Sequence, residues 1–241
     1  MRLISVSDYS ALSTAAADLI AAQILLKPAC VLGLATGSSP VGAYRELVKL
    51  HQAGRLSFSR VTTFNLDEYR GLPDDHPQSY HTFMNQNLFR AVDLPSGAAH
   101  LLDGMDPDAA RQCAGYEAAI HAAGGIDLQL LGMGHNGHIG FNEPADFFPL
   151  DTHCVDLTPS TRQANQRFFP SLDDVPRQAY TMGIRTILSA RRILILVHGA
   201  DKAEILKTAF YGPVTPQVPA SILQLHSDVT LVADEAALSA L

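Results

Sequence analysis

Short apolar runs alternate with longer amphipathic stretches along the 241-residue chain. The runs are apolar at nearly every position, which is typical of strands buried on both faces of a parallel sheet, and the longer stretches have the length of helices. The predicted strands are residues 30–35, 61–66, 126–131, 193–198 and 229–233, and the predicted helices are residues 9–26, 40–52, 107–123 and 202–210. This alternation predicts an α/β fold with a doubly wound, mostly parallel sheet flanked by helices on both faces, as in Rossmann-like proteins.

No internal repeat, low-complexity tract or flexible linker divides the sequence, so we expect a single domain over residues 1–241. Residues 145–177 differ from the rest, because prolines and paired phenylalanines interrupt them around one short helical patch. A stretch of this kind is typical of a mobile lid over a binding site.

Composition limits the class of partner. The net charge of −7, with no Lys/Arg cluster, argues against nucleic acid, so an anionic ligand must be held by local amides and a few cations. Three widely spaced cysteines without a C-x-x-C pair indicate neither a disulfide framework nor a cysteine-rich zinc site. The start does not resemble a signal peptide, and no apolar run approaches the ~20 residues of a membrane span. We therefore expect a cytoplasmic protein that binds a small molecule and no membrane.

Residues 132–144, G-M-G-H-N-G-H-I-G-F-N-E-P, are the most informative segment. They follow a predicted strand, and ligand sites of open α/β sheets lie at the carboxyl ends of strands. The glycine spacing matches a dinucleotide fingerprint, but Gly140 and Pro144 would break the helix that such a loop opens. The context therefore predicts a catalytic loop and no nucleotide cofactor.

The loop carries a candidate proton-transfer pair, His138 and Glu143. An imidazole exchanges protons readily near neutral pH, and a neighbouring carboxylate fixes its tautomer. A structural, hydrogen-bonded histidine is the alternative. A metal site of His135, His138 and Glu143 is a third reading, but the spacing is not the helical one of zinc enzymes, and we predict no metal.

Polar groups follow three other predicted strands. Asp67 and Glu68 come after the second strand, where one carboxylate would serve as a base unless both belong to a solvated face or a cap. Lys202 comes after the fourth strand and points to the same edge, unless it is surface decoration. After the first strand, amides and hydroxyls at a helix start predict a phosphate cradle, with a plain side-chain cap by one of the serines as the alternative. That cradle comprises Thr36, Gly37, Ser38 and Ser39.

These motifs, in this order, resemble the glucosamine-6-phosphate deaminases along nearly the whole chain. The matching segments are residues 34–40, 64–69 with 71–73, 137–144, 161–165 with 167–169, and 221–226. The F-N-E-P ending of the loop separates these enzymes from their relatives.

The resemblance implies an enzyme that converts glucosamine 6-phosphate to fructose 6-phosphate and ammonia without a cofactor. Asp67 would be the base that moves a proton between C2 and C1, while His138, supported by Glu143 and oriented by Asn136, would open the sugar ring. The 6-phosphate would be held by Thr36, Gly37, Ser38, Ser39, Arg167 and Lys202.

Three departures from the family pattern bear on regulation and assembly. Asn136 stands where longer members have an aspartate, so proton relay would rest more on Glu143. Asp146, His153 and Val155 stand where allosteric members bind their activator, so that activation is not expected. The sequence also ends without the carboxyl-terminal extension of hexameric members, which favours a monomer or a small homo-oligomer.

Two other functions are alternatives to a deaminase. A 6-phosphogluconolactonase would share the sheet and the phosphate loop, but residues 142–144 disfavour it. A sugar-phosphate sensor of the repressor type would need a helix-turn-helix ahead of the domain, and the predicted sheet already begins at Cys30.

Overall fold

The computed structural model describes residues 1–241, apart from the side chains of residues 160 and 164. Seven parallel strands form the main sheet, in the order β1-β10-β9-β6-β2-β3-β5. Their bounds are β1 (Arg2–Val6), β2 (Val31–Leu34), β3 (Thr62–Asn65), β5 (Ala99–His100), β6 (Leu128–Gly132), β9 (Ile193–Val197) and β10 (Val229–Asp234). The predicted doubly wound parallel sheet is confirmed.

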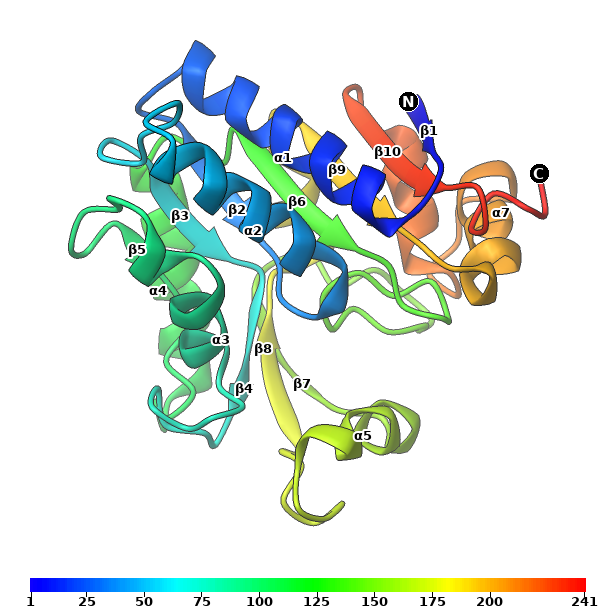
Figure 1. Ribbon diagram of the computed structural model, residues 1–241. Helices are drawn as coiled ribbons and strands as arrows, with labels where there is room; N and C mark the ends of the chain where they lie inside the picture. Colours follow the sequence, from blue (N-terminus) through cyan, green and yellow to red (C-terminus); the bar gives the residue numbers. More distant parts are fainter.

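Helices cover both faces of this sheet. Figure 1 shows α1 and α2 across the front, with α4 behind. The helices are α1 (Tyr9–Leu26), α2 (Ser38–Gln52), α3 (Tyr80–Asn87), α4 (Ala109–Ala122), α5 (Pro159–Asn165), α6 (Ile184–Leu188) and α7 (Ala203–Tyr211). Short 3₁₀ turns are η1 (Phe89–Ala91), η2 (Gln166–Phe168), η3 (Ala200–Lys202) and η4 (Pro219–Leu225).

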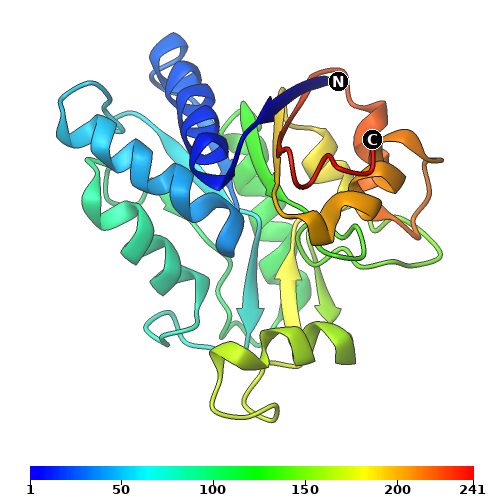
Figure 2. The same cartoon turned by 45° about the vertical axis from the view of Figure 1, so that its right-hand side comes forward.

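A second sheet of three antiparallel strands extends below the main one (Figures 1 and 2). Its order is β4-β8-β7, with bounds β4 (Asp67–Arg70), β8 (Gln178–Thr181) and β7 (His153–Asp156). A small apolar cluster around Tyr69, Phe141 and Leu157 packs against it. We call this sheet, together with α5 and η2, the lower lobe.

The sequence pattern did not reveal the lower lobe, nor β1 and α3. Strand β4 reads D-E-Y-R and β7 reads H-C-V-D, so neither is a continuous apolar run. Within residues 145–177 the expected short helix exists as α5, but β7 occupies part of a segment for which no strand was predicted. Antiparallel strands that are only partly buried carry charged residues, and for that reason a search for apolar runs passes over them.

Helix α1 corrects one expectation about membranes. Its 18 residues, Tyr9–Leu26, are long and apolar enough to pass a length-and-composition test for a membrane span. In this fold the helix packs on the sheet and on α2, burying Leu12, Ala16, Ile20 and Ile24. Its apolar composition is therefore accounted for by a core position.

The strand order fixes where the site lies. Strand β2 pairs with β3 on one side and with β6 on the other, so the order of connection reverses between β2 and β6. In open α/β sheets the ligand crevice forms at such a switch point, outside the carboxyl ends of the strands. The loops that follow β2 and β6 are the two polar segments singled out by sequence.

Candidate active site

The loop after β2 presents the amino end of α2 to the crevice. Helix α2 begins at Ser38, two residues before the predicted Pro40, and Gly37 is its capping residue with a φ of 89°. That left-handed conformation suits glycine, because a side chain there would be strained. No side-chain hydrogen bond caps this described helix end, so the alternative of a serine cap is wrong. The first-turn amides therefore lack intrahelical partners, while the Thr36 hydroxyl is directed to Asp67.

Ser39 and Lys202 both lie beside the Gly132–Met133 segment at the end of β6. Ser39 comes from the first turn of α2, which follows β2, and Lys202 comes from the turn after β9. A Cβ built on Gly132 would be 3.6 Å from Ser39 Oγ. Lys202 Nζ donates a hydrogen bond of 2.6 Å to the Met133 carbonyl oxygen. Burial lowers the pKa of Lys202 from its usual range. Ser39 and Lys202, two of the candidate phosphate-binding residues, are therefore close to the same short backbone segment.

Arg167 is the exception among the phosphate candidates. It lies in η2 of the lower lobe, and its guanidinium carbon is 4.7 Å from the centroid of the Phe168 ring. Among the described contacts none joins Arg167 to residues 36–39. A role in binding phosphate therefore requires the lower lobe to approach the helix α2 terminus.

Asp67 is the first residue of β4 and is 6% exposed, so it does not belong to a solvated face. Burial, with the nearby charge of Glu68, raises the pKa of Asp67 to about 8 against a small opposing contribution from the Thr36 hydroxyl. Its Oδ1 has no hydrogen-bond partner among the described residues. A buried carboxylate oxygen that is desolvated and unpaired is a strong proton acceptor.

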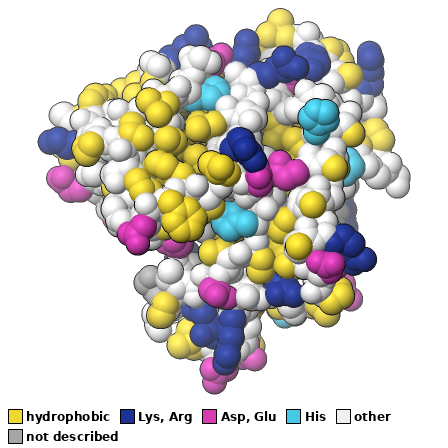
Figure 3. Space-filling view, turned by 180° about the vertical axis from the view of Figure 1, so that it is seen from behind, with side chains coloured by type: hydrophobic (Ala, Val, Ile, Leu, Met, Phe, Trp, Pro, Cys, Tyr) yellow, Lys and Arg dark blue, Asp and Glu magenta, His cyan; other side chains and the backbone are white. Residues whose placement is uncertain are grey.

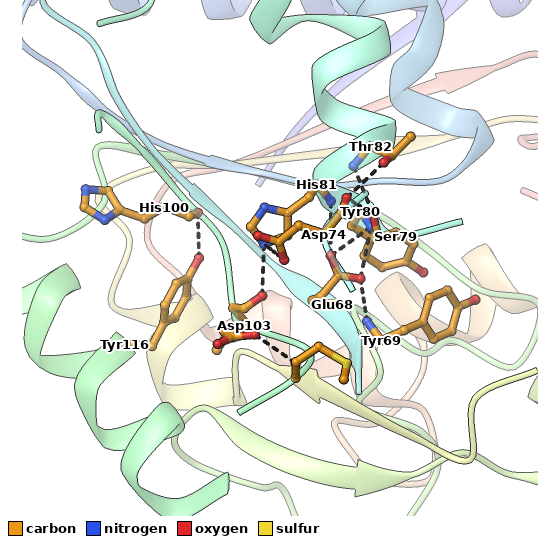
Figure 4. Close-up of polar contacts among 12 residues, drawn as sticks. Glu68, Tyr69, Asp74, Ser79, Tyr80, His81, Thr82, His100, Asp103 and Tyr116 are labelled. Carbon is orange, nitrogen blue, oxygen red and sulfur yellow. Dashed lines mark hydrogen bonds and ion pairs between the residues drawn. The ribbon is translucent and has the colours of Figure 1, made fainter. Parts of the chain in front are cut away.

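Glu68 has a structural role beside the start of α3 (Figure 4). Its carboxylate accepts hydrogen bonds from the backbone amides of Tyr69 (2.7 Å), Tyr80 (2.8 Å) and His81 (3.1 Å). Two of these amides open α3, so the acidic side chain satisfies the positive end of that helix. Burial raises the pKa of Glu68 to about 7, against the effect of these hydrogen bonds.

Asn136 lies between His138 and Glu143. His138 Nδ1 is 2.7 Å from Asn136 Oδ1 and 3.5 Å from Glu143 Oε1, while Asn136 Nδ2 donates to Glu143 Oε2 at 2.6 Å. The backbone N–H of His138 also donates to Asn136 Oδ1, so the amide can point only one way. Because Nδ1 faces oxygen acceptors, it carries the ring hydrogen, and Nε2 keeps its lone pair for a ligand.

Glu143 stays ionised in this arrangement. Burial acts to raise its pKa, but the hydrogen bond and charge of His138, with hydrogen bonds from Thr161 and Asn136, hold the pKa at about 2. Thr161, from α5 of the lower lobe, was not among the predicted site residues. It lies within a matched family segment, but nothing in its spacing from the loop indicates contact with Glu143.

Gly134 is required by the position of the His138 ring. A Cβ on Gly134 would lie 2.1 Å from His138 Cε1, so any side chain there would displace the imidazole. The Gly134 N–H also donates to the His138 carbonyl oxygen at 2.9 Å, closing the loop on itself. The glycine spacing that resembles a nucleotide fingerprint thus serves to seat a histidine.

Strand β8 joins this loop to the Asp67 end of the site. Thr181 pairs with Asp67 across the sheet, and its Oγ1 accepts the Phe141 N–H at 3.1 Å. Asn142 is buried and donates to the carbonyl oxygens of Ile139 and Met182, both at 2.9 Å. The F-N-E-P segment is thereby fixed against the end of β8, the same strand that pairs with Asp67.

His135 turns away from the other loop side chains. Its Nε2 is 2.6 Å from Asp201 Oδ2, and both side chains are exposed. Among the described residues, no group of three or more His, Cys, Asp and Glu side chains is arranged to hold a metal ion. The structure does not assemble the alternative set of His135, His138 and Glu143.

The surface around the lower lobe is charged. Seen from behind, the upper body exposes many hydrophobic side chains, whereas the lower lobe carries Lys and Arg side chains beside Asp and Glu (Figure 3). Of the arginines in the adjoining segment, Arg162 is partly buried and donates to the Leu172 carbonyl oxygen at 2.7 Å, whereas Arg167 and Arg177 are exposed. Exposed positive groups therefore accompany acidic ones on this lobe.

Comparisons with known proteins agree with this geometry. The family described as glucosamine-6-phosphate isomerases/6-phosphogluconolactonase matches residues 7–232. Proteins named glucosamine-6-phosphate deaminase from Halothermothrix orenii and Clostridioides difficile are each 52% identical over 241 residues, covering 100% of this chain and 100% and 97% of those proteins.

Solved structures give the same picture. A monomeric glucosamine-6-phosphate deaminase has a TM-score of 0.97 to this chain at 48% identity, with 100% of both chains covered. The 6-phosphogluconolactonase of Thermotoga maritima has a TM-score of 0.75 at 24% identity, covering 97% of this chain and 99% of its own. At that identity the second likeness establishes a shared fold only.

The two acidic site residues should affect stability in opposite directions. The Asp67 pKa is raised from 3.8 to about 8, so its contribution opposes folding increasingly as the pH rises through this range, and fully above it. The Glu143 pKa is lowered from 4.5 to about 2, so its stabilising contribution is complete above 4.5 and is lost as the pH falls toward 2. At pH 9 we expect Asp67→Asn to raise the free energy of unfolding by at least about 1 kcal/mol and Glu143→Gln to lower it.

Urea denaturation of both variants at pH 5 and pH 9 measures this difference. The gain from Asp67→Asn should shrink at the lower pH. A loss of stability in Asp67→Asn at pH 9 would contradict an unpaired, buried carboxylate.

Proposed function

The chain belongs to the glucosamine-6-phosphate isomerase/6-phosphogluconolactonase family, and we propose from this that it is a glucosamine-6-phosphate deaminase that forms fructose 6-phosphate and ammonia. The observation that carries the proposal is a buried, unpaired carboxylate, Asp67, on a strand that pairs with β8, against which the loop of the His138–Glu143 pair is also fixed. A lactonase needs only the attack of water on an ester, and it has no use for a desolvated carboxylate placed to move a carbon-bound proton. The 52% identity to deaminases favours the same branch.

The 6-phosphate binds at the amino end of α2. Amides of Ser38 and Ser39, with the loop hydroxyls, donate hydrogen bonds to the anion, and the helix dipole favours its charge. Lys202 supplies a cation from the opposite side of the crevice. This local set of donors explains how a chain of net charge −7 binds an anion.

Ring opening comes first, because a cyclic aldose has no acidic proton beside a carbonyl group. His138 Nε2 removes the proton from the C1 hydroxyl and returns a proton to the ring oxygen as the bond between C1 and that oxygen breaks. Asn136 and Glu143 hold the imidazole in the tautomer that leaves Nε2 free.

Isomerisation and deamination follow on the open chain. Asp67 takes the C2 proton, which gives an enol-type intermediate, and delivers it to C1. The amine at C2 is then an iminium ion, to which water adds before ammonia leaves. A carboxyl pKa near 8 makes Asp67 a stronger base than an ordinary aspartate, which suits transfer of a weakly acidic proton.

Residues 145–177, which contain β7, α5 and η2, supply the lid. We assign this role to them because Thr161 of α5 contacts Glu143, and because Arg167 reaches the phosphate only if this segment closes. We further propose that the single-domain enzyme acts in the cytoplasm as a monomer or a small homo-oligomer. A monomeric deaminase structure at 48% identity supports the smaller assembly.

Purified protein should release ammonia from millimolar glucosamine 6-phosphate without added metal or nucleotide. A parallel assay with 6-phosphogluconolactone on the same preparation tests the rival. Lactone hydrolysis without ammonia release would overturn the proposed function.

Asp67→Asn should lower kcat by about 10² or more, because it removes the general base while preserving size. Steady-state kinetics of ammonia release measures the effect, and competition by inorganic phosphate checks that binding survives. Replacing the exposed Asp228, which pairs with Arg192, by Asn is a matched control that should leave kcat unchanged. Turnover within twofold of the parent in Asp67→Asn would show that another group is the base.

Lys202→Ala should raise KM by about tenfold with kcat nearly unchanged, because a phosphate clamp binds the ground state and the transition state alike. Kinetics across a wide range of substrate concentration separates the two constants. A fall in kcat at constant KM would remove Lys202 from the phosphate site.

A further inference from the structure

Tyr9, the first residue of α1, places its hydroxyl inside the first turn of α2. Tyr9 Oη donates to the Ser38 carbonyl oxygen at 2.8 Å and accepts the Gly42 N–H at 3.0 Å. Ser38 and Gly42 are four residues apart, which is the pair that an α-helical turn joins directly. The phenol therefore takes part in the hydrogen bonding of the helix end that faces the phosphate.

The backbone of Tyr9 is itself held firmly. Asp8 caps α1 by accepting the Ala11 N–H at 2.9 Å, and Ser13 Oγ donates to the Tyr9 carbonyl oxygen at 2.7 Å. The two helices approach closely at Gly42, where a Cβ would lie 2.0 Å from Ser13 Oγ and 3.2 Å from Tyr9 Cε1. A close contact of this kind fixes the position of the tyrosine relative to α2.

The Tyr9 ring also contacts the His198 ring. The two ring centroids are 4.8 Å apart with the planes tilted by 54°. His198 directly follows β9, and Lys202 follows four residues later in η3. Tyr9 thus lies between the strand end that provides the amides and the strand end that provides the cation.

We propose that Tyr9 is a positioning residue for the 6-phosphate site, a role that rests on the proposed function. Its hydroxyl holds the Ser38 peptide, so the free amides of the first turn keep their direction toward the anion. Its ring fixes the distance from α2 to the end of β9. Tyr9 touches no reacting atom, so its loss weakens phosphate binding in the ground state and the transition state equally.

Tyr9→Phe removes the hydroxyl and keeps the ring contact with His198. We expect KM for glucosamine 6-phosphate to rise about 3- to 10-fold with kcat within twofold, as follows from the loss of one hydrogen bond. The dissociation constant of inorganic phosphate, measured by the rise in Tm with phosphate concentration, should increase by the same factor. A role confined to stability would lower Tm in the absence of phosphate and leave that constant unchanged.

Tyr180→Phe is the matched control, because Tyr180 Oη donates to the Asp106 carbonyl oxygen at 3.2 Å in the lower part of the molecule. It should change neither KM nor phosphate affinity. His198→Ala is a second test, which removes the ring contact alone and should also raise KM at constant kcat.

Unchanged KM and phosphate affinity in Tyr9→Phe would overturn the inference, as would a fall in kcat at constant KM. Failure of the proposed function is distinguishable from this result. It would appear as absence of ammonia release by the parent protein, whereas phosphate affinity is measured without turnover.

Discussion

The burial of one unpaired carboxylate oxygen, on Asp67, is the constraint around which the site is arranged. Desolvation raises its pKa to about 8, and an ordinary core would replace such a group or pair it with a cation. Neighbouring side chains hold the structure around this carboxylate. Glu68 binds the start of α3, the Thr36 hydroxyl lies beside the carboxylate, and Thr181 anchors the strand opposite.

The second sheet holds the proposed base in place as well as extending the fold. A parallel sheet alone brings the loops after β2 and β6 to one edge, but β4 must leave that edge for Asp67 to face the crevice. Pairing of β4 with β8 gives it a partner, and Thr181 of β8 also receives the Phe141 amide. Asp67 and the His138 loop, which carry the proposed base and the proposed ring-opening histidine, are therefore attached to the same strand, and the proposed site is built across two sheets.

Sequence predicted the parts of the fold that depend on continuous apolar runs, which are the five inner strands and the longer helices. It also singled out the loop after β2, Asp67 and the His138 loop as site candidates, because these follow buried strands directly. It missed the lower lobe, since partly exposed antiparallel strands such as β4 and β7 carry charges. Contacts such as that of Thr161 with Glu143 depend on how α5 docks, and no local spacing encodes docking.

Asn136 affects which nitrogen of His138 can exchange a hydrogen ion during each turnover. A carboxamide neither gains nor loses a hydrogen ion near neutral pH, so it blocks transfer from His138 Nδ1 to the more distant Glu143 Oε2 through that route. In the proposed mechanism the imidazole recycles a single hydrogen ion through its opposite nitrogen, taking it from the C1 hydroxyl and giving it to the ring oxygen, while Glu143, 3.5 Å from Nδ1, stays ionised. In this scheme the enzyme leaves the ring-opening step in the charge state in which it entered, and isomerisation of the same open-chain sugar begins without exchange of a hydrogen ion with the buffer.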